Sequence, residues 1–121
     1  MDEKIFLCPS NALDNSGLAV PFDVVYEGRT CSAFAIRYEG EVHAYLNRCV
    51  HIPMEMDYQP NKFFDTTGQW LLCATHCAVY SPSSGQCVEG PCRGQLIKIT
   101  LSEADSNVYW HTNYNLKTID F

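Results

Sequence analysis

Apolar and polar positions alternate along this chain in short runs, a pattern that predicts β-strands. β-Branched and aromatic residues fill the segments 22–26 and 30–38, and Glu27-Gly28 between them is a turn signal. Glu39-Gly40 predicts a second tight turn, after which residues 42–46 return as another strand. We therefore expect a β-meander that delivers the chain to Cys49.

Shorter apolar runs farther along the chain predict more strands, at 69–72, 78–80, 95–101 and 108–110. Turn-forming residues dominate much of the first 20 positions, the stretch from 52 to the strand at 69, and residues 81–85. No long helical pattern is present, and 121 residues suffice for one domain with one core. The pattern predicts an all-β fold, a small antiparallel barrel or sandwich.

Four residues in two short segments form a candidate metal site. Cys49 and His51 make a Cys-x-His pair, Cys73 and His76 make a Cys-x-x-His pair, and 21 residues separate the pairs. Thiolate and imidazole together suit zinc, but structural zinc motifs usually group their ligands as a Cys pair and a His pair. Each segment here supplies one of each, which favours a two-iron cluster with both sulfurs on one iron and both imidazoles on the other.

The same region contains Tyr80, a turn at Gly85 and the dipeptide Gly90-Pro91. In order and approximate spacing, residues 49 to 93 resemble the cluster-binding region of Rieske 2Fe-2S proteins, with weaker resemblance over about 20–110. One departure is Cys77, which stands where the family has Gly after the second His. The resemblance implies a single Rieske-type domain over 1–121, with the cluster-binding part at about 47–93 and built from two hairpin loops.

The resemblance also implies roles for individual residues. The metal ligands would be Cys49, His51, Cys73 and His76, and Pro91 would lie in the third loop of the site. Tyr80 occupies the position at which high-potential respiratory members have a Tyr whose hydroxyl donates to the first Cys sulfur. Those members also have two further cysteines joined as a disulfide, and Met54 and Thr75 replace them here. These differences favour the soluble ferredoxin side of the family.

Charge and composition limit the partners and the location. The 14 acidic and 8 basic residues give a formal net charge of -6, which argues against nucleic acid and makes a basic protein partner the better fit. No apolar run approaches the ~18 residues of a membrane helix, and the start MDEKIF does not resemble a signal peptide. We expect a cytoplasmic protein without a membrane anchor. The five other cysteines, Cys8, Cys31, Cys77, Cys87 and Cys92, are expected to be reduced, with a disulfide among Cys77, Cys87 and Cys92 as the alternative that the sequence leaves open.

The function implied by the resemblance is that of a soluble Rieske-type ferredoxin. It would carry one electron at a time from a reductase to an oxygenase or another redox enzyme. We expect no enzyme activity, because only His43 and His111 remain beside the ligand histidines, and we assign both to strand packing or the surface. Three alternatives stay open: a small Rieske subunit of an assimilatory nitrite reductase, a redox-sensing module, and a zinc-binding structural domain.

Overall fold

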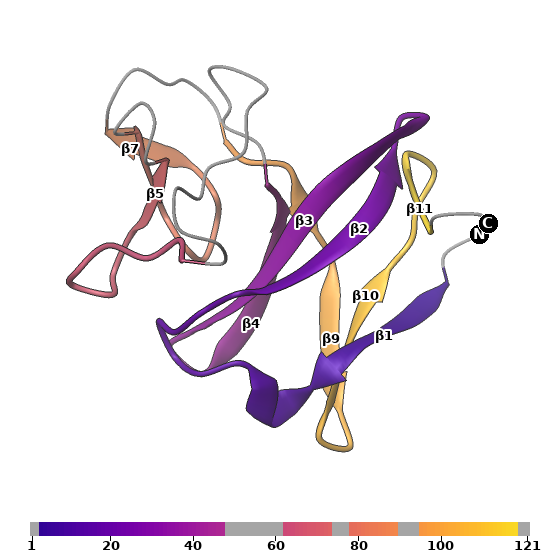
Figure 1. The fold of residues 1–121 in the computed structure, drawn as a ribbon, viewed down its shortest axis with the longest axis horizontal. Helices are drawn as coiled ribbons and strands as arrows, with labels where there is room; N and C mark the ends of the chain where they lie inside the picture. The colour runs from indigo at the N-terminus through magenta and orange to yellow at the C-terminus, as the bar shows by residue number, and fades with distance from the viewer. Residues whose placement is uncertain (1–2, 48–61, 74–77, 90–94, 119–121) are drawn as a thin grey trace.

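The chain folds into curled antiparallel sheets in the computed structural model, which describes residues 3–47, 62–73, 78–89 and 95–118 (Figure 1). These residues contain strands and one short 3-10 turn but no α-helix. The strands are β1 (Lys4–Pro9), β2 (Val20–Tyr26), β3 (Arg29–Tyr38), β4 (Glu41–Leu46), β5 (Leu71–Cys73), β6 (Ala78–Tyr80), β7 (Cys87–Glu89), β8 (Lys98–Ile99), β9 (Leu101–Ala104), β10 (Asn107–His111) and β11 (Leu116–Lys117), and the turn η1 is Ser10–Ala12. The predicted all-β fold is confirmed.

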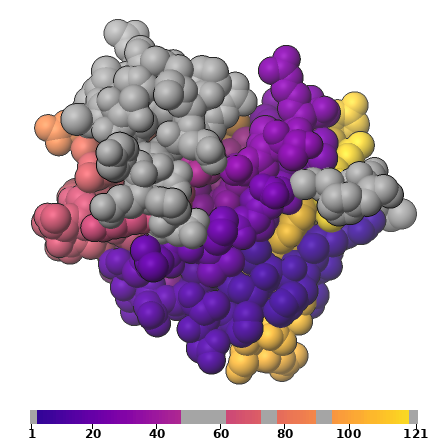
Figure 2. Space-filling view, viewed as in Figure 1, coloured from indigo at the N-terminus to yellow at the C-terminus, as the bar shows by residue number. Residues whose placement is uncertain are grey.

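These strands form three sheets. The largest has the order β11-β2-β3-β4-β8, a second has the order β1-β10-β9, and a small third sheet has the order β5-β6-β7. Figure 1 shows β5 and β7 at one end of the molecule, apart from β1, β9 and β10 at the other, with the long strands β2 and β3 between them. The space-filling view shows the indigo N-terminal residues lying against the orange and yellow C-terminal segment, as the pairing of β1 with β10 requires (Figure 2).

The two predicted hairpin turns are present, and in each of them a Glu-Gly pair adopts positive φ. Glu27 and Gly28 have φ values of 48° and 81°, and Glu39 and Gly40 have 49° and 84°. Positive φ at both central residues defines the type I′ turn, which matches the twist of paired strands. Each turn therefore fixes the register of its hairpin. Tyr26 lies opposite Arg29 in the first hairpin, and Tyr38 lies opposite Glu41 in the second.

β3 separates two hydrophobic cores. Its alternate residues Phe34 and Ile36 belong to a core that the small sheet also helps to build. Ala33 and Ala35, on the opposite face, belong to a second core between the two larger sheets. All four side chains are almost completely buried. The strand thus has two apolar faces, and the small sheet is packed directly on the larger one.

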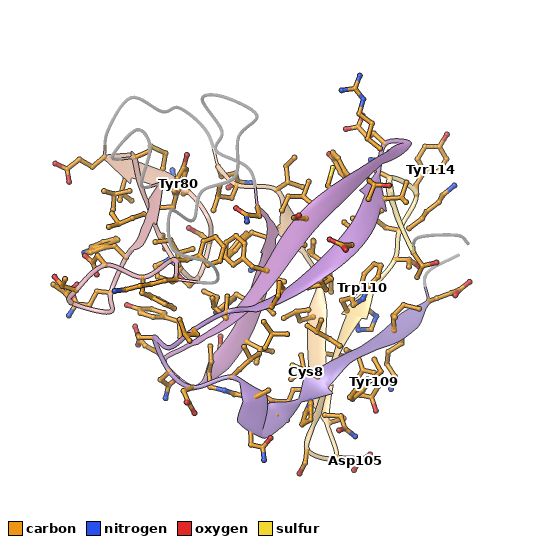
Figure 3. All side chains as sticks on the ribbon, viewed as in Figure 1. Cys8, Tyr80, Asp105, Tyr109, Trp110 and Tyr114 are labelled. Atoms are coloured by element: carbon orange, nitrogen blue, oxygen red, sulfur yellow. The ribbon has the colours of Figure 1, made fainter. Side chains whose placement is uncertain are left out.

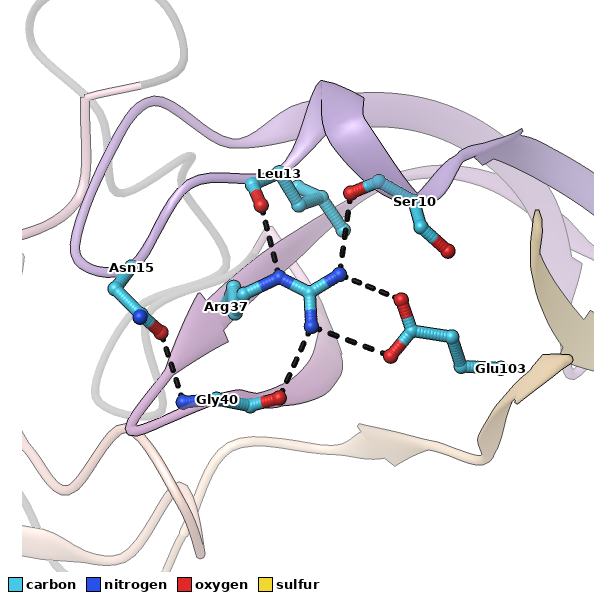
Figure 4. A network of polar contacts seen from close by, with 6 residues as sticks. All are labelled: Ser10, Leu13, Asn15, Arg37, Gly40 and Glu103. Atoms are coloured by element: carbon cyan, nitrogen blue, oxygen red, sulfur yellow. Dashed lines mark hydrogen bonds and ion pairs between the residues drawn. The ribbon is translucent and has the colours of Figure 1, made fainter. Parts of the chain in front are cut away.

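Arg37 of β3 is the centre of a network of polar contacts (Figure 4). Its guanidinium donates to the backbone carbonyls of Leu13, Ser10 and Gly40 at 2.8 to 3.1 Å. It also forms an ion pair with Glu103 of β9, with the shorter N···O distance at 2.6 Å. One side chain of β3 therefore connects η1, the β3–β4 turn and β9.

Several short elements differ from those that the sequence predicted. No strand was expected in the first 20 residues, yet residues 4–9 form β1 because they pair with β10, about 100 residues farther along the chain. The single strand expected over 95–101 is divided into β8 and β9, because the chain changes partner at Thr100: Ile99 pairs with β4, while Leu101 pairs with β10. The short strands β7 and β11 were not expected at all.

Candidate metal centre

The predicted ligands lie at the boundary of the described residues. Cys73 is the last residue of β5, whereas Cys49, His51 and His76, like Pro91, lie outside the described residues. Their assignment as ligands stays a prediction. Within the described part of the chain, no group of three or more His, Cys, Asp or Glu side chains could hold a metal ion. What the structure does define is the framework from which the predicted ligand segments extend.

Regular structure leads into each predicted ligand segment. β4 ends at Leu46, and Asn47 is still held to the large sheet by its N–H, which donates to the Ser32 carbonyl at 2.9 Å. β5 and β6 pair antiparallel, with Cys73 opposite Ala78, so residues 74–77 connect the two strands of a hairpin. This pairing on either side of the second ligand segment was predicted from the sequence. β7 ends at Glu89, immediately before the Gly90-Pro91 dipeptide.

The small sheet rests on an aromatic core. Leu71, Ala78 and Tyr80 on its inner face are fully buried. Phe63, just before the sheet, stacks on Phe34 of β3 with ring centroids 3.8 Å apart. Tyr80 is the last residue of β6, the central strand of the small sheet, and lies between Leu71 of β5 and Cys87 of β7 (Figure 3). Its predicted hydrogen bond to the Cys49 sulfur involves atoms outside the described residues and stays a prediction.

The turn between β6 and β7 is bound to the large sheet, a contact that the sequence analysis missed. The Tyr45 hydroxyl donates to the Pro82 carbonyl at 2.7 Å, and the Lys98 ammonium donates to the Ser83 carbonyl at 3.1 Å. The Leu96 N–H donates to the Gly85 carbonyl at 2.7 Å. Burial raises the pKa of the Tyr45 phenol, so this group stays a hydrogen-bond donor well above neutral pH.

The two remaining histidines occupy different sheets. His43 on β4 is 8% exposed, and burial, together with the positive charge of Lys98, lowers the pKa of its imidazole. His111 on β10 lies 2.8 Å from the Ser102 hydroxyl through Nε2. His43 is therefore a strand-packing residue, as the sequence predicted, and His111 is half-buried at a sheet surface.

One expectation about the cysteines was wrong. Cys8 is buried and Cys31 is half-buried, and both are free thiols, with burial raising the pKa of Cys8. Cys87 was expected to be reduced but is disulfide-bonded, to a sulfur outside the described side chains. The partly buried Cys87 packs against the core around Phe34. The odd number of cysteines in the sequence did not indicate a disulfide. Cys77 and Cys92 lie outside the described residues.

The residues present in the sequence fit an iron-sulfur cluster chemically. Two thiolates and two neutral imidazoles are the donor set of a cluster with one sulfur-bound and one nitrogen-bound iron. Cys73 at the end of a paired strand gives one of these donors a fixed backbone position.

No helix in the described residues is both long and apolar enough to cross a membrane.

Comparison with known proteins identifies relatives of the whole domain. The family model described as the Rieske [2Fe-2S] domain matches residues 3–112. No curated protein matches the chain. Among solved structures, the ferredoxin of carbazole 1,9a-dioxygenase from Nocardioides aromaticivorans IC177 is similar, with a TM-score of 0.69, 18% identity, and coverage of 88% of this chain and 95% of that one.

Two further structures have the same fold. The ferredoxin of Sphingomonas yanoikuyae B1 aligns with a TM-score of 0.67 and 18% identity, covering 92% of this chain and all of that one. The terminal oxygenase of carbazole 1,9a-dioxygenase from Novosphingobium sp. KA1 aligns with a TM-score of 0.66 and 19% identity, covering 90% of this chain but 29% of that one. At 18% and 19% sequence identity, the similarity to these structures shows a shared fold only.

Proposed function

Because the chain belongs to the Rieske [2Fe-2S] family, we propose that it is a soluble Rieske-type ferredoxin, an electron carrier with no catalytic site of its own. The observation that carries this proposal is the family match over residues 3–112, within which Cys49, His51, Cys73 and His76 stand in the order of the family's ligands. The alignment with a solved ferredoxin supports it too, since this chain covers 95% of the ferredoxin from Nocardioides. We place the protein in the cytoplasm.

The protein residues would tune the cofactor through their charge. A 2Fe-2S cluster supplies one-electron chemistry, and with two His in place of two Cys its potential falls at roughly -150 to +300 mV, against about -400 mV for plant-type ferredoxins. Neutral imidazoles of His51 and His76 remove two negative charges from the ligand set, which favours the reduced state. The unligated ring nitrogens of these histidines would exchange protons in step with reduction. Tyr80 would donate a hydrogen bond to the Cys49 sulfur and favour reduction further.

We propose a reductase as the electron donor and an oxygenase or another redox enzyme as the acceptor. One of the similar structures is a complex between oxygenase and ferredoxin in carbazole 1,9a-dioxygenase. The acidic balance of this chain, with a net charge of -6, suits brief contact with basic partner surfaces. Electrostatic attraction of this kind speeds association, which is what a carrier with two partners requires.

The test is to purify the protein without oxygen and measure its metal content, sulfide content and redox titration. We expect about two iron atoms and two acid-labile sulfides per chain and reduction by one electron, with a rhombic electron paramagnetic resonance signal in the reduced state. Cys73→Ala should abolish the cluster. Cys31→Ala, which removes a free thiol from β3 in the large sheet, is the matched control and should keep it. A colourless protein with one zinc per chain would exclude the proposal.

A further inference from the structure

The turn between β6 and β7 is bound to the large sheet by two side chains that are themselves neighbours. Tyr45 of β4 and Lys98 of β8 are register partners in that sheet. They reach the carbonyls of two consecutive turn residues, Pro82 and Ser83. Because the Tyr45 side chain is fully buried, loss of its hydroxyl would leave a buried carbonyl without that donor. We refer to residues 81–86 as the docked turn.

Gly85 brings the docked turn close to the Tyr45 ring. Its φ is +75°, and a Cβ built on it would lie 2.7 Å from Tyr45 Cε1 and 3.3 Å from Leu96 Cβ. Its N–H donates to the Ser81 carbonyl at 2.7 Å, which closes the turn, and its carbonyl accepts from Leu96. Glycine is therefore required both by the backbone conformation and by the space between turn and ring.

The docked turn joins β6 and β7, and the other ends of these two strands adjoin the predicted ligand segments in the sequence. β6 begins at Ala78, two residues after His76, and β7 ends at Glu89, directly before Gly90-Pro91. Each strand has three residues, so only about 10 Å of paired strand separates the docked turn from these segments. A displacement at the turn would be carried along the hairpin, because short paired strands move as a unit.

We propose that Tyr45 and Lys98 are positioning residues for the metal centre: by binding the docked turn they fix the β6–β7 hairpin on the large sheet and so fix the ligand segments at its other end. The inference rests on the proposed function. It assigns to two residues outside the ligand motif a part in setting the geometry, and hence the electronic properties, of the cluster.

The test compares Tyr45→Phe with the wild type, using Tyr109→Phe as the matched control. Both substitutions remove one phenol oxygen, but Tyr109 lies on β10, in the sheet at the other end of the molecule, where its ring contacts Phe6 (Figure 3). Lys98→Met is a second variant, at an exposed position where folding is not at risk. Four quantities are measured: the iron content, the amide hydrogen exchange of Leu96, the line widths of the reduced cluster's paramagnetic resonance, and the midpoint potential.

We expect Leu96 to exchange about tenfold faster in Tyr45→Phe, which corresponds to losing one buried hydrogen bond of about 1.4 kcal/mol. The resonance lines should broaden and the midpoint should shift, with a smaller effect in Lys98→Met and none in Tyr109→Phe. If the iron content, line widths and midpoint of Tyr45→Phe and of Lys98→Met equal those of the wild type, the docked turn is purely structural and the inference is wrong. A protein without iron would instead refute the proposed function.

Discussion

Arg37 and Glu103 form the polar network that joins η1, the β3–β4 turn and β9. The Arg37 side chain is 15% exposed and makes bonds to three backbone carbonyls as well as to the carboxylate. A planar guanidinium can satisfy four acceptors in fixed directions, which a lysine cannot. The ion pair is therefore part of a network, where such pairs contribute more than isolated surface pairs do.

Replacing Glu103 should lower stability in a way that depends on pH. The hydrogen bond from Arg37 lowers the pKa of the Glu103 carboxyl from its ordinary value of 4.5. A carboxyl with a lowered folded-state pKa stabilises the fold above its unfolded pKa, and this contribution is lost as pH falls through the folded value. Glu103→Gln should therefore cost about 1 kcal/mol at pH 7, and the difference from wild type should shrink below pH ~4.5.

The measurement is urea unfolding of both proteins at a series of pH values. Asp23→Asn, which removes an exposed carboxylate from β2, is the control and should leave stability nearly unchanged at every pH. A Glu103→Gln deficit that stays constant from pH 7 down to pH 3 would show that charge plays no part in the contact.

At the scale of elements, two turn glycines have nearly the same backbone conformation but different surroundings. Gly28 has φ +81° and nothing within 4 Å of a built Cβ, while Gly85 has φ +75° and the Tyr45 ring at 2.7 Å. Gly28→Ala should cost only the strain of positive φ, about 1 kcal/mol. Gly85→Ala should cost that amount plus about 1–3 kcal/mol for overpacking. Equal losses in chemical denaturation would show that the docked turn yields easily to the added methyl group.

The elements that could be predicted from the sequence are those whose signals are local. The Glu-Gly turns and the strands they join follow from nearby residues, and so does the hairpin around residues 74–77. β1 was missed because its partner β10 is about 100 residues away and only pairing makes it a strand. The contact between Tyr45 and the docked turn has no local signal either, because nothing near Tyr45 in the sequence indicates which carbonyl its hydroxyl will meet.

The candidate site likewise has some features that could be predicted from the sequence and others that could not. The family could be predicted from a short motif, because metal coordination fixes residue type and spacing together, and the four proposed ligands come from the same motif. The disulfide at Cys87 could not be predicted, since pairing depends on the distance between cysteines in space. The residues that support the site, such as Phe63 under the small sheet, share no spacing rule with the ligands and emerge only from the fold.

At the scale of the whole molecule, the two cores should unfold together because β3 contributes one face to each. The chain has two tryptophans, and each reports on a different half: Trp110 is buried in the core between the larger sheets, while Trp70 is 38% exposed beside the small sheet. Fluorescence melts of Trp70→Phe and Trp110→Phe, each with one remaining reporter, should be superimposable with far-ultraviolet circular dichroism of the same variant. Within either variant, a fluorescence midpoint several degrees from the dichroism midpoint would show that the cores are independent.

The pairing of β1 with β10 has a consequence for how the protein is made. Glu3 and Thr112, 109 residues apart, exchange two hydrogen bonds at the end of this pair. At a translation rate of about 5–20 residues per second, β1 leaves the ribosome roughly 5–20 s before its partner. The β2–β4 meander, joined by two-residue turns, needs no such delay and is complete long before. We therefore expect newborn chains to hold a formed meander beside an unpaired N-terminal strand, whose edge needs protection from other chains until the ribosome delivers β10.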